Sequence, residues 1–173
     1  MKKITRILAL ALTLALMLGA VVGVLSSAAE YDAEGYVLAT NVAYDDDLAP
    51  MFAIDRSKVE NVDSLSVTVN GVEATYVGTD DNLYNLSDEE IEAGAVPTAA
   101  AIFKSKGIAP KNLDADLTVV VSVDGEAVAT ITYNVALDYF QAKLDGGATG
   151  AKAALYTATL EYAAAAKAHF NKK

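Results

Sequence analysis

The chain has 173 residues, with 13 Lys and Arg against 23 Asp and Glu, a single histidine, and neither cysteine nor tryptophan. The formal net charge of −10 provides no broad positive field for phosphate groups, which argues against a nucleic-acid binder. Without cysteine the chain has no disulfide framework, no thiol nucleophile and no cysteine-ligated zinc.

The first 29 residues have the pattern of an export signal. Three basic residues and no acidic residue are followed by an apolar run from Ile7 to Leu25, and then by the small residues of positions 26–29. Signal peptidase accepts small residues of this kind, so cleavage is predicted after Ala29. The alternative is an uncleaved anchor, because the run of 19 residues is long enough to span a bilayer.

Cleavage would leave 144 residues that carry a net charge of −13, since the signal contains three basic residues and no acidic one. A chain of this length can bury a sufficient core without disulfides. We therefore expect one secreted or cell-surface domain of bacterial origin, with no membrane association after cleavage. Residues 30–134 are expected to be rich in β-strands, and residues 135–173 to form a helical pair packed on the same domain.

The first half of the mature chain predicts short strands. Residues 35–39 and 51–54 are apolar runs of strand length. In residues 64–77 apolar and polar side chains alternate on both sides of Asn70-Gly71, the preferred two-residue turn of a hairpin. That turn would pair Val69 with Val72, Val67 with Ala74 and Leu65 with Tyr76, and would place all six on one face.

The middle of the chain predicts a polar loop, one short strand and a second hairpin. Residues 79–97 contain the helix-start signature Ser87-Asp88-Glu89-Glu90, and residues 98–103 read as a strand. Residues 116–134 alternate around Asp124-Gly125. A three-residue loop is favoured here because it pairs apolar residues throughout, namely Val123 with Ala127, Val121 with Ala129, Val119 with Ile131 and Leu117 with Tyr133.

The pattern changes from strand to helix after Asn134. Residues 135–144 predict a short helix with Val135, Tyr139 and Leu144 toward the core. Residues 151–170 contain nine alanines and predict a longer helix, with one stripe at Leu155, Thr159, Tyr162 and Ala166 and another at Tyr156, Leu160 and Ala163. The predicted fold class is α+β, an antiparallel β-sandwich-like region followed by two C-terminal helices.

The C-terminal part resembles a module of secreted and cell-surface proteins of clostridial (Firmicutes) bacteria, in which an immunoglobulin-like region ends in two helices. Val135, Asp138 and Tyr139 match the first helix of that module. Its final helix is matched by Leu155, Ala158, Leu160, Tyr162, Ala164, Ala165, Ala166 and Phe170. The chain departs from that pattern at Ala163, Lys167 and His169. The resemblance covers residues 116–170 and implies a non-catalytic part of a surface protein, without a known ligand.

Candidate sites are few. Tyrosines in the less regular segments are the candidate ligand contacts, because an aromatic ring with a polar end suits a sugar or protein surface: Tyr31, Tyr36, Tyr44 and Tyr84. The acidic runs 45–47 and 80–82 can offer oxygen ligands to calcium but lack the spacing of a calcium loop, so no metal or other cofactor is assigned. His169, near the C-terminus, is a poor anchor for a catalytic triad.

The sequence therefore predicts a non-catalytic interaction module that binds a protein or glycan partner outside the cell. A carbohydrate-binding or adhesive protein is one alternative, and a small carboxylate-dependent hydrolase is another. A fourth hypothesis is a structural module whose apolar final helix docks onto another chain, which predicts an exposed apolar face on that helix.

Overall fold

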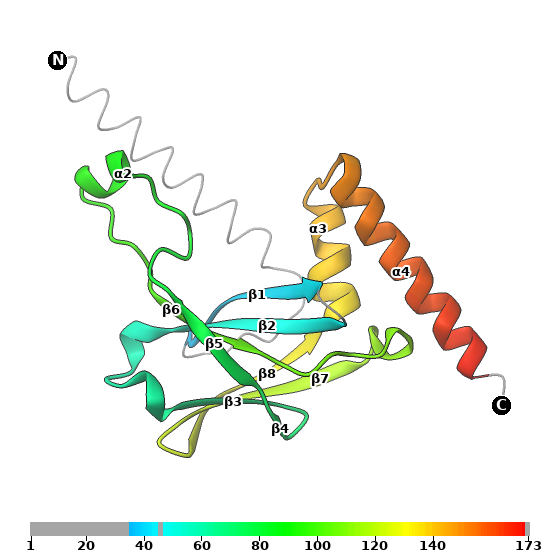
Figure 1. The fold of residues 1–173 in the computed structure, drawn as a ribbon, viewed down its shortest axis with the longest axis horizontal. Coiled ribbons are helices and arrows are strands. Elements are labelled where there is room, and N and C mark those ends of the chain that lie inside the picture. Colours follow the sequence, from blue (N-terminus) through cyan, green and yellow to red (C-terminus); the bar gives the residue numbers. More distant parts are fainter. Residues whose placement is uncertain (1–34, 45–46, 172–173) are drawn as a thin grey trace, which may run out of the picture.

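Two four-stranded antiparallel sheets and a set of C-terminal helices make up the fold of this computed structural model, which describes residues 35–44 and 47–171 (Figure 1). Sheet A has the order β1 (Val37–Tyr44), β2 (Leu48–Asp55), β6 (Ala100–Lys104), β5 (Thr75–Asp80). Sheet B has the order β4 (Val72–Glu73), β3 (Leu65–Val69), β7 (Asp116–Val123), β8 (Glu126–Asn134). The predicted α+β class is confirmed.

Short helical segments connect the strands, and three further helical segments follow β8. They are η1 (Arg56–Lys58), η2 (Val62–Ser64), α2 (Asp88–Glu92), η3 (Pro110–Asn112), the π-helix η4 (Val135–Gln141), α3 (Ala142–Asp145) and α4 (Gly150–Phe170). The predicted capping box is present at α2, where Ser87 and Glu90 exchange hydrogen bonds.

The core lies between the two sheets. Alternate residues of β3 and β7 are buried, as period-two patterning requires. Phe52 of sheet A meets Tyr133 of sheet B edge-on, with ring centroids 5.5 Å apart, and both side chains are almost completely buried. These inward side chains hold the two sheets face to face.

The prediction for the first hairpin is confirmed at the turn, but it is wrong at the end of the hairpin farthest from the turn. Asn70 and Gly71 both have positive φ, and Val69 pairs with Val72. Ala74 donates its backbone N–H to the backbone oxygen of Val67 at 2.8 Å. After Ala74 the chain crosses to sheet A, where Tyr76 pairs with Phe103. Val72 and Tyr76 are therefore exposed by 45% and 44%, and not on the buried face.

In the second hairpin the predicted three-residue loop is wrong, although the register beyond it is confirmed. The turn is the two-residue Asp124-Gly125, which pairs Val123 with Glu126. A register shift between Val121 and Ser122 then restores the predicted pairs from Val121–Ala129 onward. A β-bulge thus reconciles a tight turn with an apolar inner face.

The C-terminal helices dock at one end of the sandwich. Val135 and Tyr139 face the core as predicted, whereas Leu144 is only half-buried on α3. On α4 the packed side holds Tyr156, Leu160 and Ala163. Of the other predicted stripe, Leu155 and Tyr162 are exposed by 47% and 61%, so the final helix rests on the domain by one side only.

Asn134 joins the last strand to the helices, and its replacement by alanine should be costly. Its side-chain amide donates to the backbone oxygen of Asp114 at 3.0 Å and to the carboxylate of Asp116 at 2.9 Å, and its side-chain oxygen accepts from Leu137 N at 3.2 Å. Because Asn134 is buried, Asn134→Ala should lower the free energy of unfolding by about 1–2 kcal/mol.

Denaturant unfolding, followed by circular dichroism, measures this loss of stability. Thr132→Ala, at an exposed site on the same strand, is the matched control, and an equal loss in both variants would contradict this role.

Candidate functional site

A cleft with a volume of about 710 Å³ lies at the end of sheet A where β2 passes into η1. We call it the η1 cleft, and its lining residues are Leu38, Asp55, Arg56, Ser57, Tyr84, Val96, Pro97, Thr98 and Ala99. Four separate stretches of the chain, at residues 38, 55–57, 84 and 96–99, therefore form one concave surface.

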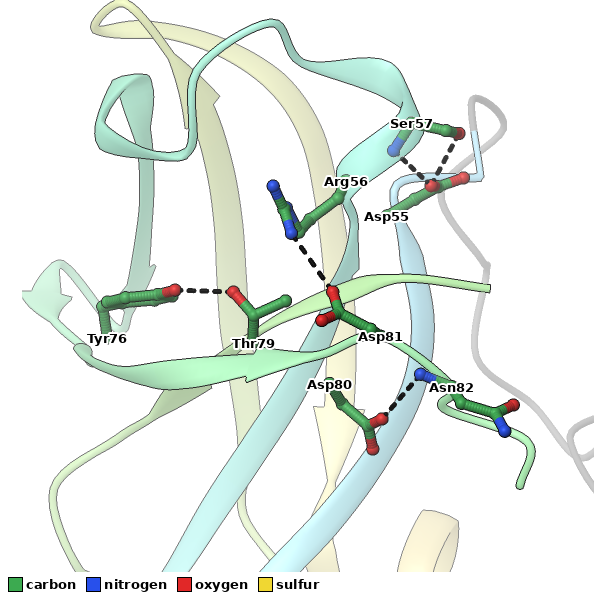
Figure 2. Close-up of polar contacts among 8 residues, drawn as sticks. All are labelled: Asp55, Arg56, Ser57, Tyr76, Thr79, Asp80, Asp81 and Asn82. Carbon is green, nitrogen blue, oxygen red and sulfur yellow. Dashed lines mark hydrogen bonds and ion pairs between the residues drawn. The ribbon is translucent and has the colours of Figure 1, made fainter. Parts of the chain in front are cut away.

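The polar side of the η1 cleft is held in place by local hydrogen bonds (Figure 2). Asp55 accepts from the backbone N–H of Ser57 at 2.8 Å and from its hydroxyl at 2.7 Å, which caps η1. Arg56 donates its backbone N–H to Ala99 at 3.1 Å, and its guanidinium lies 3.3 Å from the Asp81 carboxylate. Arg56 is the sole arginine after residue 6, so it is a distinctive cation in an acidic chain.

The apolar side of the cleft comes from the loops after β5 and before β6. Leu83 N donates to the backbone oxygen of Thr98 at 3.0 Å, which joins the two loops. Asn82 closes the first loop by bonding both backbone groups of Leu86, at 2.8 and 2.9 Å. Tyr84 projects from this fixed loop with 43% of its surface exposed. Partial burial, and secondarily the Asp55 carboxylate, raise the pKa of Tyr84 above its usual value.

The structure does not gather the predicted tyrosines onto one platform. Tyr31 lies outside the described residues. Tyr36 is half-buried against the core, with the Lys58 ammonium 4.9 Å above its ring. Tyr44 is the last residue of β1. Tyr84 lines the η1 cleft together with Leu38, which lies near the opposite end of β1. Tyr44 and Tyr84 therefore belong to different surfaces.

Tyr44 lines a second pocket of about 400 Å³, on the side of the domain where α4 packs. The other lining residues are Asp47, Leu48, Gly107, Ile108, Ala109, Pro110 and Tyr162. A side chain at Gly107 would overlap the Asp47 carboxylate, so glycine permits this close approach. Burial raises the pKa of Tyr44 to about 12, while a hydrogen bond with Thr159 opposes the shift.

The acidic run 80–82 is occupied by local contacts. Asp80 accepts from Asn82 N at 2.9 Å, and Asp81 pairs with Arg56 (Figure 2). Hydrogen bonds from the Ser87 backbone and hydroxyl lower the pKa of Glu90. Within residues 35–44 and 47–171, no three His, Asp or Glu side chains are grouped as ligands for a metal ion. Asp45 and Asp46 lie outside the described residues.

One carboxyl group outside these clefts has a raised pKa. Burial raises the pKa of Asp138, while a hydrogen bond from the Asn134 backbone N–H at 2.7 Å opposes the shift. Asp138 therefore helps Asn134 to cap η4, and it lines neither of the clefts described above. His169 is exposed near the end of α4, with its ring packed edge-on against Phe170.

Sequence reasoning missed several residues of the η1 cleft. Arg56 had a signal, as a lone arginine two residues after the strand predicted at 51–54. Val96, which is 82% exposed, had none. The backbone hydrogen bond between Leu83 and Thr98 brings the two loops together, and local pattern does not predict such a pairing.

Comparisons of the chain with family models, with curated proteins and with solved structures give no match. No helix among the described residues is both long and apolar enough to cross a membrane. Function is therefore inferred from the geometry of the η1 cleft and from the exposed side chains.

Proposed function

We propose that this chain is an exported, non-catalytic interaction module that acts outside the cell or at the bacterial surface, and that its η1 cleft contacts the ligand. The export signal predicted for residues 1–29 and the resemblance to clostridial surface modules support the location. The cleft supports the binding role, because it is concave and mostly apolar, with a few convergent polar groups.

The observation that carries the proposal is the meeting of Tyr84 and Val96 with the polar groups of η1. Tyr84 and Val96 expose apolar surface that water solvates poorly, and both line one cleft. Asp55, Arg56 and Ser57 supply carboxylate, guanidinium and hydroxyl groups beside them. A ligand with one apolar face and one polar edge fits this arrangement.

A glycan partner is the more specific form of the proposal. A sugar ring has an apolar C–H face that stacks on an aromatic side chain, and hydroxyls that need oriented polar partners. Tyr84 supplies the aromatic surface, and Arg56 with Asp55 supplies donors and acceptors. A protein partner remains the alternative form.

Hydrolysis by carboxylates receives less support. That chemistry uses two carboxyl groups facing each other across the scissile bond. Among the described residues that line the η1 cleft, Asp55 is the one carboxylate, and it accepts two hydrogen bonds from Ser57. This arrangement favours binding over catalysis.

The test is the binding of residues 30–173 to isolated cell wall and to a glycan array, with and without calcium. Tyr84→Ala should weaken binding about tenfold, because it removes the aromatic surface of the cleft. Tyr76→Ala is the matched control, since Tyr76 is 44% exposed but lies on β5 outside the cleft. Equal affinity in both variants would contradict the η1 cleft as the binding site.

The same experiment distinguishes the ligand classes. Binding only to a protein component of the wall would exclude the glycan form, and dependence of binding on calcium would assign a role to the acidic runs.

A further inference from the structure

The helix α4 uses only part of its circumference to pack on the domain. Ala163 is buried, and Tyr156 and Leu160 are half-buried against the core, where Tyr156 meets the rings of Tyr139 and Phe140. Figure 1 shows α4 outside the two sheets, beside η4 and α3. The helix also packs against η3, Lys167 pairs with Asp114, and Tyr162 borders the pocket that Tyr44 lines. The flank that begins at Tyr162 and runs away from these contacts is exposed among the described residues.

One exposed flank of α4 has the spacing of a coiled-coil seam. Six exposed positions follow one another at alternating intervals of four and three residues, and we call them the α4 seam: Ala151, Leu155, Ala158, Tyr162, Ala165 and His169. Two of them are large apolar side chains with about half or more of their surface exposed, Leu155 at 47% and Tyr162 at 61%. An average interval of 3.5 residues keeps one stripe facing a partner helix along its whole length.

The size pattern within the α4 seam is self-complementary. Large residues occupy every second position, and alanine occupies the positions between them. In an antiparallel pair centred near position 160, each large residue faces an alanine of the second copy: Leu155 faces Ala165, Tyr162 faces Ala158, and His169 faces Ala151. Alternation of large and small side chains across an interface fills space without voids. A parallel pair would instead place alanine opposite alanine and leave gaps.

The charge distribution also favours a second copy at this place. The chain after residue 29 carries −13, so most of its surfaces repel those of another copy. From residue 150 to residue 170, the charged side chains are Lys152, Glu161 and Lys167, which sum to +1. The α4 seam is therefore an apolar surface on which two copies can meet with little repulsion.

We propose that two copies of this chain associate through their α4 seams in antiparallel orientation. This proposal is independent of ligand binding in the η1 cleft. The seam is about 27 Å long at 1.5 Å per residue, and one helix pair of that length buries less area than the standard interface of roughly 1,600 Å². The dimer is accordingly weak, with a dissociation constant in the micromolar range or above. The pairing also brings the two copies of Glu161 near the symmetry axis, where they repel each other.

Sedimentation equilibrium of residues 30–173, over a concentration series that reaches the millimolar range, tests the proposal. The native chain should show a monomer–dimer equilibrium, and Ala158→Glu should weaken association more than about tenfold, because it places a charge against Tyr162 of the other copy. Ala164→Glu is the matched control at an exposed position away from the seam, and it should leave the equilibrium unchanged. Glu161→Gln should strengthen association. A monomer at every concentration, or equal effects of the two glutamate variants, would overturn the proposal.

The orientation can be tested separately because the chain has no native cysteine. When Ala158→Cys and Tyr162→Cys chains are mixed and oxidised, antiparallel pairing should join the two variants to each other. Parallel pairing would join each variant to itself, and that result would overturn the antiparallel arrangement.

Discussion

Phe140→Ala should lower the free energy of unfolding by about 3–5 kcal/mol, the cost typical of removing a buried aromatic side chain. Phe140 is fully buried, and its ring lies edge-on or tilted to three tyrosine rings, with centroids 6.0 Å from Tyr44, 5.2 Å from Tyr139 and 5.8 Å from Tyr156. We call these four residues the aromatic cluster. It joins β1, η4 and α4, so its loss should also loosen the helices from the sheets. Chemical denaturation, followed by circular dichroism in the far and near ultraviolet, measures both effects.

Phe170→Ala provides the matched control for that substitution. Phe170 is 51% exposed at the end of α4, with the Lys111 ammonium 4.9 Å from its ring. Its removal should cost less than about 1 kcal/mol, since it deletes one exposed cation–π contact and one ring contact with His169, and leaves no cavity. Equal losses from Phe140→Ala and Phe170→Ala would mean that the aromatic cluster does not hold the helices in place.

Alkaline pH should destabilise the fold through the same cluster. Burial raises the pKa of Tyr44 to about 12, and burial also raises the pKa of Tyr139, whose hydroxyl donates to Asn41 at 2.8 Å. An unfolded tyrosine has a pKa of about 10. Between pH 10 and 12 the folded state therefore retains protons that the unfolded state loses. This contribution to stability is complete below pH 10 and is lost as the pH rises toward 12.

The expected loss between pH 9 and pH 12 is on the order of 3 kcal/mol for the two tyrosines together, with the share of Tyr44 reduced because that side chain is 40% exposed. Urea unfolding at a series of pH values measures the loss, and tyrosinate absorbance reports the two late ionisations. A Tyr44→Phe/Tyr139→Phe double variant is the control, because it keeps the rings and removes both titrating groups. A native chain that is as stable at pH 12 as at pH 9 would contradict the burial of these hydroxyls.

The fold class and the positions of the two hairpin turns were predictable from sequence because they depend on local chemistry. Asn70-Gly71 and Asp124-Gly125 adopt positive φ wherever they occur as hairpin turns, and period-two alternation marks an inner face. The partner of each strand was less accessible to sequence reasoning. β3 pairs with β7 and β2 pairs with β6 across about 50 residues of chain, and β-propensity does not encode which strands meet.

The errors arose where two local rules competed. At the second hairpin the turn residues required a two-residue loop and the apolar pattern required another register, and a bulge satisfied both. On α4 two adjacent stripes are apolar, and packing of the helix against η4 and η3 selects the one that carries Tyr156. Of the candidate site, sequence reasoning found Tyr84 but not Arg56 or Val96, because the η1 cleft exists only after distant loops have paired.

The crossing of the chain from β4 to β5 has a consequence for how this protein can fold while it is being synthesised. Val72–Glu73 belongs to sheet B and Thr75–Asp80 to sheet A, so the chain changes layers at Ala74. Any break between residues 70 and 100 consequently leaves strands of both sheets on each fragment. During synthesis sheet A lacks an inner strand until residue 104 has emerged, and sheet B lacks its last strand until residue 134 has emerged. A nascent chain thus completes neither sheet until more than half of its length has been translated. The strands that complete the two sheets then emerge within about 30 residues of each other.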